Sequence, residues 1–255
     1  MSSPGLKEID SLPLTGHHLK RVVVLTGAGI SSESGIPTFR GTDGFWSRFR
    51  PEELATPQAF TANPKLVWEW YLYRRNLIAQ AQPNAGHYAL VELEKLLGDA
   101  FGLITQNVDG LHQRAGIRKL LELHGSIFAN RCVKCFGRFS DDALDFNRLP
   151  PQCPKCSGAI RPDVVWFGES LNIATIEDAF ALSRRATLYL AIGTSAVVHP
   201  AATLPLAGRQ NGAFLVEINP EPTPLSADAD VVLRFSSALA LPLLLDKIRS
   251  ILLPC

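Results

Sequence analysis

Residues 21–26, with the sequence RVVVLT, run directly into Gly27-Ala28-Gly29, and the pattern of this stretch indicates the first βα unit of the chain. The β-branched, apolar run predicts a buried strand that ends in a tight turn. Glycines in such a turn let the backbone approach a pyrophosphate, and amide groups at a helix start favour its negative charge. Alone the turn is a weak signal, because strand-to-helix turns often need glycine for purely steric reasons.

Similar apolar runs recur along the chain, and most are followed by a polar or glycine-containing turn and a helix-compatible stretch. They are residues 101–105, 120–123, 188–192, 214–218 and 231–235. This alternation predicts an α/β fold with a mostly parallel sheet.

Two segments interrupt the alternation. Residues 41–84 show no strand signal, and within them Pro64–Gln80 predicts an aromatic-rich amphipathic helix that starts at a proline. Residues 126–162 are rich in loop-forming residues and carry two CxxC pairs, as a small metal-held module would. We expect residues 1–255 to form one α/β domain whose helical and metal-binding insertions make up a small lobe.

Composition excludes some classes of partner. The 25 basic and 24 acidic residues leave a net charge of +1, so no global field attracts nucleic acid or an anionic membrane. Four of the five cysteines stand in CxxC pairs, which suits a reducing compartment, and we expect a cytoplasmic protein. The first residues lack the apolar region of a signal peptide, and no run reaches the ~18 apolar residues of a membrane span.

The glycine turn does not fit a hydride-transfer dehydrogenase. Read as GxGxxG, the run that begins at Gly27 has Ser32 in place of the third glycine. About twenty residues further on, where an acidic strand end should bind the ribose, Glu52 and Glu53 follow Pro51 in a helix-like context. Instead, a loop rich in glycine and proline leads to Arg40, and such a loop can cover a bound cofactor.

Polar side chains follow several of the predicted strands. Gln106, Asn107 and Asp109 follow residues 101–105, and His124 follows residues 120–123. Two further turns of this kind are Gly193-Thr194-Ser195 and the turn at Asn219. Each alone could be an ordinary surface loop, but parallel strands end at one edge of their sheet, where ligands bind. Together these turns predict a ligand site.

Four cysteines form two CxxC pairs separated by seventeen residues: Cys132, Cys135, Cys153 and Cys156. This spacing favours a tetrahedral zinc site over a redox CxxC, which needs one pair, and over free thiols. Four thiolates leave no position for water, so the zinc would be structural. Acidic and basic residues are mixed in the surrounding loops, which disfavours a nucleic-acid-binding module.

His124 is the candidate general base among six histidines. It ends a strand, precedes Gly125 and falls on the predicted ligand edge, and an ordinary imidazole pKa of ~6.5 suits a base at neutral pH. We interpret the other five as structural: His17, His18, His87, His112 and His199.

In order and spacing, the motifs GAGISSESGIPTFRG, TQNVDGLH, LHG, the paired CxxC and GTS resemble the sirtuin family of NAD-dependent protein-lysine deacylases. The resemblance extends from about residue 21 to the C-terminal helix, and Ser32, usually alanine in the family, is a small departure. It implies one catalytic domain with a Rossmann-like NAD-binding core and a small lobe that holds one structural zinc.

The resemblance also implies a reaction that consumes NAD. The amide oxygen of an acylated lysine attacks C1′ of the nicotinamide ribose and releases nicotinamide. His124 then deprotonates a ribose hydroxyl, which takes the acyl group as O-acyl-ADP-ribose. The cofactor residues implied by the family pattern are Gly27, Ala28, Gly29, Ile30, Ser31, Glu33, Pro37, Thr38, Phe39, Arg40, Trp46, Gln106, Asn107, Val108, Asp109, Gly193, Thr194, Ser195, Asn219, Pro220, Glu221 and Ala238.

The substrate side of the site follows from the same resemblance. The segment VVWFGE looks like the one that pairs with the substrate peptide as an added strand, through Val165, Phe167, Gly168 and Glu169. We expect acylated-lysine proteins as partners and a monomeric enzyme.

Tyr71 and Arg74 are three residues apart, so they share a helix face and could bind a carboxylate together. Alternatively the aromatic residues around them simply pack, and Arg74 and Arg75 stay solvated. WEWYLYRR resembles sirtuins that remove acidic acyl groups, and the small Ala55 suits a roomy acyl pocket. This implies desuccinylation and demalonylation, with some deacetylation.

Two other function classes remain. An ADP-ribosyltransferase or NAD glycohydrolase would cut the same bond of the cofactor but pass the ribose carbon to another acceptor. A non-catalytic dinucleotide sensor or zinc-ribbon interaction protein would not release nicotinamide at all.

Overall fold

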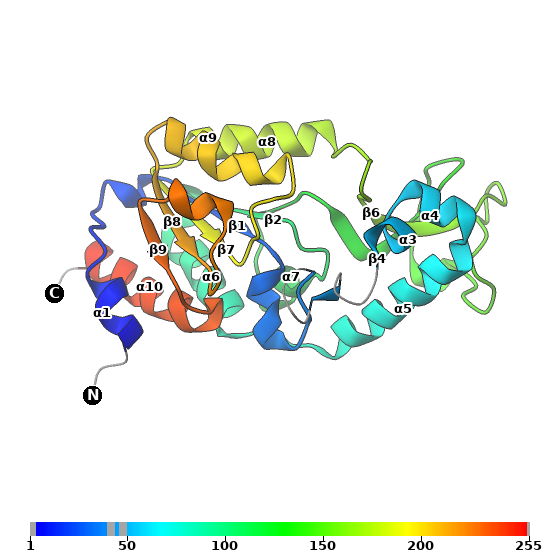
Figure 1. Ribbon diagram of the computed structural model, residues 1–255, viewed down its shortest axis with the longest axis horizontal. Helices are drawn as coiled ribbons and strands as arrows, with labels where there is room; N and C mark the ends of the chain where they lie inside the picture. Colours follow the sequence, from blue (N-terminus) through cyan, green and yellow to red (C-terminus); the bar gives the residue numbers. More distant parts are fainter. Residues whose placement is uncertain (1–3, 40–43, 46–49, 254–255) are drawn as a thin grey trace.

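A computed structural model describes residues 4–39, 44–45 and 50–253 (Figure 1). Within these residues, six strands form a parallel sheet in the order β3-β2-β1-β7-β8-β9. They are β1 Val22–Thr26, β2 Phe101–Thr105, β3 Leu120–Glu122, β7 Leu188–Ile192, β8 Phe214–Ile218 and β9 Val231–Leu233. The strands predicted from the apolar runs are confirmed, and β3 and β9 end slightly earlier than expected.

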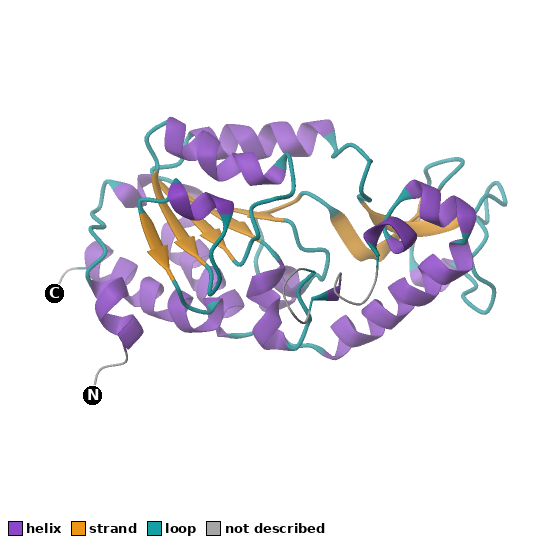
Figure 2. Ribbon diagram, viewed as in Figure 1, coloured by secondary structure: helices purple, strands orange, loops and turns teal. Residues whose placement is uncertain are grey.

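Helices cover both faces of this sheet (Figure 2). Val22 and Val24 face a core shared with α6 Ala85–Leu97 and α10 Ser237–Leu252. Val23 and Leu25 face a second core shared with α8 Ile173–Arg184 and α9 Leu204–Gln210. Since both faces are buried, the strands are apolar without alternation, as in an α/β protein. In the described part of the chain, the helices all fall short of the length and apolar character that crossing a membrane requires.

Several other helices are short. They are α1 Pro4–Asp10, α7 Leu111–Ala115 and the 3-10 helices η1 His18–Lys20, η2 Ala28–Ser34, η3 Gly98–Ala100, η4 Asp141–Ala143, η5 Ala201–Thr203 and η6 Pro224–Ala227.

A small lobe lies at one end of the molecule (Figure 1). It contains α3 Pro51–Leu54, α4 Pro57–Ala62, α5 Pro64–Gln80 and a sheet with the order β5-β4-β6. The strands are β4 Gly125–Cys132, β5 Arg138–Phe139 and β6 Ile160–Val164. The predicted helix Pro64–Gln80 is confirmed, and the Asn63 side chain caps it by accepting the Leu66 amide.

The metal-binding insertion is more ordered than the loop-rich segment that the sequence predicts. Its ends pair as antiparallel strands β4 and β6, with an irregularity between Gly125 and Asn130. That break in register disturbs the alternation of buried and exposed residues by which a strand is recognised in sequence. One core cluster joins this sheet to α5 and includes Trp68, Ile127 and Cys132.

Strand order reverses between β1 and β7, and the turns after these two strands touch backbone to backbone. The Gly29 amide donates to the Gly193 carbonyl at 2.8 Å. A Cβ on Gly29 would lie 2.7 Å from the Gly193 Cα, closer than real Cβ atoms approach. Gly29 and Gly193 are therefore required for steric reasons, because larger residues would keep the two turns apart.

We expect Gly29→Ala to lower the free energy of unfolding by about 1–3 kcal/mol, because the added methyl group meets rigid backbone. Thermal or denaturant unfolding would measure this. Gly16→Ala is the control, since among the described atoms a Cβ there meets no heavy atom within 4 Å. An equal effect of both substitutions would contradict the packing explanation.

Candidate active site

A cavity of about 670 Å³ opens where the parallel sheet meets the small lobe. The strand-end turns at Gly27, Gln106, His124, Gly193 and Asn219 all line it. The structure thus brings together the turns that the sequence places at one edge of the sheet, beside the point where strand order reverses, which is the usual ligand position in open α/β sheets.

Most of the predicted site residues lie in this wall, and the rest fall into two groups. Those in the wall are Gly27, Ala28, Gly29, Thr38, Phe39, Ala55, Tyr71, Arg74, Gln106, Asn107, Val108, His124, Val165, Phe167, Gly168, Glu169, Gly193, Thr194, Ser195, Asn219, Pro220 and Glu221. Those outside the described wall are Ile30, Ser31, Glu33, Pro37, Asp109 and Ala238. Arg40 and Trp46 lie outside the described residues.

Several of the residues outside the wall support those within it. Ser31 donates to the Asp109 carboxylate at 2.8 Å and lies 3.3 Å from the Asn107 amide nitrogen. The Glu33 carboxylate accepts from the Ser236 hydroxyl and from the Ala238 amide, each at 2.8 Å. Glu33 therefore ties the glycine turn to the start of α10.

Side chains also join neighbouring turns. The Gln106 amide donates to the Thr194 hydroxyl at 2.8 Å, and the Asn219 amide donates to the Thr194 carbonyl at 2.8 Å. The turns after β2, β7 and β8 are therefore held in one arrangement. Such cross-links preorganise a binding wall, because less side-chain freedom remains to be lost when a ligand binds.

His124 is half-buried, and its ring is oriented by one hydrogen bond. The Nδ1 atom lies 2.9 Å from the Gln106 carbonyl, which can only accept, so Nδ1 carries the proton and Nε2 keeps its lone pair. Burial lowers the pKa of this imidazole below its ordinary value. The neutral form, which can act as a base, therefore persists to lower pH than in a solvated histidine.

Tyr71 and Arg74 both reach the cavity, and Arg74 is only 4% exposed. Its guanidinium carbon lies 4.9 Å from the centre of the Phe39 ring and 4.8 Å from that of Trp70. Among the described residues, its Nε finds no hydrogen-bond partner. Burial lowers the pKa of Arg74, while the nearby Asp109 carboxylate opposes this change.

Arg75, the next residue, serves a different purpose. It is 5% exposed and donates to the Ile127 carbonyl at 2.6 Å and to the Asn130 side chain at 2.8 Å. Its ion pair with Asp141 measures 3.1 Å. The alternative that Arg74 and Arg75 stay solvated is therefore wrong, because the helix turns one arginine toward the cavity and the other into the lobe.

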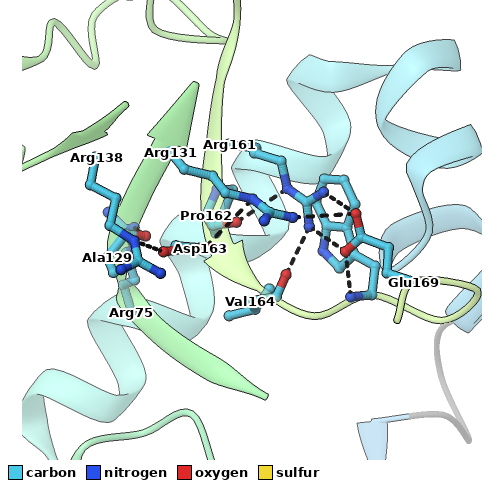
Figure 3. A network of polar contacts seen from close by, with 10 residues as sticks. Arg75, Ala129, Arg131, Arg138, Arg161, Pro162, Asp163, Val164 and Glu169 are labelled. Atoms are coloured by element: carbon cyan, nitrogen blue, oxygen red, sulfur yellow. Dashed lines mark hydrogen bonds and ion pairs between the residues drawn. The ribbon is translucent and has the colours of Figure 1, made fainter. Parts of the chain in front are cut away.

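The segment expected to bind the peptide is held at both ends. The Val165 amide donates to the His124 carbonyl and the Phe167 amide to the Ala55 carbonyl, each at 2.9 Å. The Glu169 carboxylate pairs with Arg161 at 2.5 Å (Figure 3). Glu169 therefore stabilises this segment through its ion pair with Arg161, and it also lines the cavity.

The sulfur atoms of the four predicted zinc ligands all lie within 4.8 Å of one another. Cys132 and Cys156 are 3.5 Å apart, and Cys135 and Cys153 are 3.7 Å apart. Tetrahedral zinc with Zn–S bonds of about 2.3 Å requires sulfur separations of roughly this size. The four cysteines fit a zinc ion held by four thiolates. None of them is among the described residues that line the cavity, so the ion would have a structural role.

Comparison with known proteins gives a consistent result. A model of the Sir2 family matches residues 27–200. The chain belongs to the Sir2 family. It is 53% identical over 228 residues to an NAD-dependent protein deacylase of Aquifex aeolicus (strain VF5), a match that covers 89% of this chain and 95% of that protein.

Solved Sir2 structures share the fold over nearly the whole chain. One is a Sir2 homologue in complex with NAD, with a TM-score of 0.85 and 46% identity, covering 98% of this chain and 94% of that one. Another is a Sir2 protein with a deacetylated p53 peptide and 3′-O-acetyl ADP ribose, with a TM-score of 0.82 and 33% identity, covering 94% and 97%.

The wall of this Sir2 site includes residues that sequence analysis missed. They are Trp70, Leu171, Val198, His199, Pro200, Ile218, Pro222, Thr223, Ser236 and Ser237, whereas Ser32, Val164 and Trp166 lie within the glycine motif and the VVWFGE segment that the sequence already assigns to the site. Ser236 and Ser237 follow β9, so the rule applied to the other strand ends would have found them. His199, interpreted from sequence as structural, also lies in the wall.

Removing zinc from this Sir2 protein with a chelator should lower its thermal stability and abolish activity, because the thiols would lose the ion that holds them together. Metal analysis should find one zinc per chain, lost on Cys132→Ser. Cys255→Ser is the control, since this cysteine stands outside the CxxC pairs. Unchanged unfolding without zinc would contradict a structural ion.

Proposed function

We propose that this chain removes succinyl and malonyl groups from protein lysines in preference to acetyl groups. The observation that carries the proposal is Arg74, a buried guanidinium beside the cavity that has no ion pair among the described residues. A buried charge is costly unless it is paired. A carboxylate on the acyl group of the substrate would pair with it.

The chain is an NAD-dependent protein deacylase, the activity named for its Aquifex relative. When bound, NAD supplies the electrophilic ribose carbon that receives the acyl oxygen. In our proposal the turns at Gly27, Gln106, Gly193 and Asn219 hold this cofactor. His124 takes a proton from a ribose hydroxyl through Nε2, since Nδ1 already donates to the Gln106 carbonyl.

Tyr71 complements Arg74 in the proposed acyl pocket. Its hydroxyl accepts the indole hydrogen of Trp166 at 2.8 Å, and it lies in the same cavity wall as Arg74. Burial raises the pKa of the phenol, so it keeps its proton at neutral pH. A neutral phenol and a guanidinium can both donate to one carboxylate, and the small Ala55 leaves room for the longer acyl chain.

Other parts of the proposal concern context. We propose that residues 41–84 and 126–162 are insertions into one catalytic domain, and that the enzyme is a cytoplasmic monomer without nucleic-acid partners. The near-neutral charge supports the absence of nucleic-acid partners, and the cysteine usage supports the cytoplasmic location.

Arg74→Met should lower kcat/KM for a succinyl-lysine peptide by about 10- to 100-fold, because a hydrogen bond to a charged group contributes about 1.5–3 kcal/mol. Cleavage of the acetyl version of the same peptide should change little. Arg75→Met is the matched control: it should lower stability but leave the ratio of succinyl to acetyl activity unchanged. Unchanged succinyl cleavage by Arg74→Met would refute the acidic-acyl proposal.

His124→Ala should retain NAD affinity and lose turnover, because the base is removed while the cofactor wall remains. Calorimetric titration with NAD and an acyl-peptide assay would measure the two effects. His17→Ala, an exposed histidine outside the described wall, is the control. Near-normal turnover would show that another group is the base, and nicotinamide release without peptide would indicate a glycohydrolase.

A further inference from the structure

Trp166 connects the peptide-binding segment to the proposed acyl pocket. It is 3% exposed, lines the cavity and donates its indole hydrogen to the Tyr71 hydroxyl oxygen at 2.8 Å. Tyr71 itself is 2% exposed. Among the described residues, the indole is the only hydrogen-bond partner of this phenol.

The position of Trp166 is set by an ion pair. The Arg161 guanidinium carbon lies 3.2 Å from the centre of the indole ring, and Arg161 donates to the Glu169 carboxylate at 2.5 and 2.9 Å. The same carboxylate accepts the Trp166 backbone amide at 2.9 Å. Arg161 is also bonded to the Val164 carbonyl at 2.8 Å. The ring and the backbone of Trp166 are therefore both held by one pair of charges.

The direction of this hydrogen bond controls what the phenol can do. An indole N–H only donates, so the Tyr71 oxygen accepts from it. Among the described residues the phenolic hydrogen finds no acceptor, and the neighbouring Arg74, which only donates, cannot supply one. A ligand that supplies an acceptor between these two groups satisfies both, which an acetyl methyl group cannot do.

We propose that Trp166 is a specificity-determining residue that, held by Arg161 and Glu169, orients Tyr71 as a hydrogen-bond donor to an acyl carboxylate. This inference rests on the proposed preference for succinyl and malonyl groups. Trp166 lies in the peptide-binding segment, and it affects the selectivity of the pocket through its hydrogen bond to the Tyr71 phenol.

The test is Trp166→Phe, which retains an aromatic ring and removes the indole hydrogen. Steady-state kinetics on succinyl-, malonyl- and acetyl-lysine versions of one peptide would be compared with the wild-type enzyme. We expect kcat/KM for the two acidic acyl groups to fall about five- to tenfold, mainly through a higher KM. The acetyl values should stay within about twofold.

Two further variants separate orientation of Tyr71 from general loosening. Trp68→Phe removes another buried indole hydrogen bond, 2.7 Å long to the Ile160 carbonyl, outside the described wall. It should lower stability without changing the ratio of acidic to acetyl activity. In a Tyr71→Phe background, Trp166→Phe should have no additional effect on that ratio, because the phenol through which it acts is gone.

Each remaining outcome overturns the inference. An unchanged ratio in Trp166→Phe shows that the indole hydrogen does not determine selectivity. An equal fall in Trp68→Phe indicates general loosening, and an additive fall in the Tyr71→Phe background excludes the phenol as the route. If the wild-type enzyme shows no preference for acidic acyl groups, both the proposed function and this inference are wrong. If the wild-type preference is present but Trp166→Phe does not change it, only this inference is wrong.

Discussion

The turns after β1 and β7 lie in close contact, and this contact positions the strand ends that form the site. At Gly29 and Gly193 the two backbones meet at hydrogen-bonding distance, and no side chain fits between them. Because strand order reverses there, the sheet opens into a cavity whose wall is built from successive strand ends. Gln106, Thr194 and Asn219 cross-link those ends. These hydrogen bonds fix the relative positions of the turns that form the wall.

The small lobe contributes charge to this site. The two adjacent arginines of α5 lie in different environments. Arg75 donates hydrogen bonds to carbonyl and carboxylate oxygens inside the lobe, whereas Arg74 faces the cavity among aromatic rings. Stacking on rings compensates part of the cost of burying a guanidinium, and a carboxylate would compensate more. The same lobe carries the four-cysteine cluster, so the zinc module and the proposed acyl pocket share one core.

Local patterns were sufficient for the elements of the fold. Strands buried on both faces appear as continuous apolar runs, and Pro64–Gln80 is bounded by a proline and a capping asparagine, so both kinds of element carry their own signals. The sheet of the metal-binding insertion carries no such signal in its sequence, because β4 is irregular where it pairs with β6. Ser236 follows β9, so the rule used for the other strand ends could have predicted it. His199 could not be predicted, because nothing local distinguishes it from a structural histidine.

The amino-acid sequence alone predicted the parallel sheet, the cysteine cluster, the family resemblance and the position of His124 at a strand end. These follow from spacing along the chain, which short-range geometry converts directly into structure. The three-dimensional packing was needed to show that Arg74 is buried without an ion pair among the described residues while Arg75 is satisfied, and that Trp166 bonds to Tyr71 across ninety-five positions. Burial and pairing depend on neighbours that are distant in sequence, so no local pattern could reveal them.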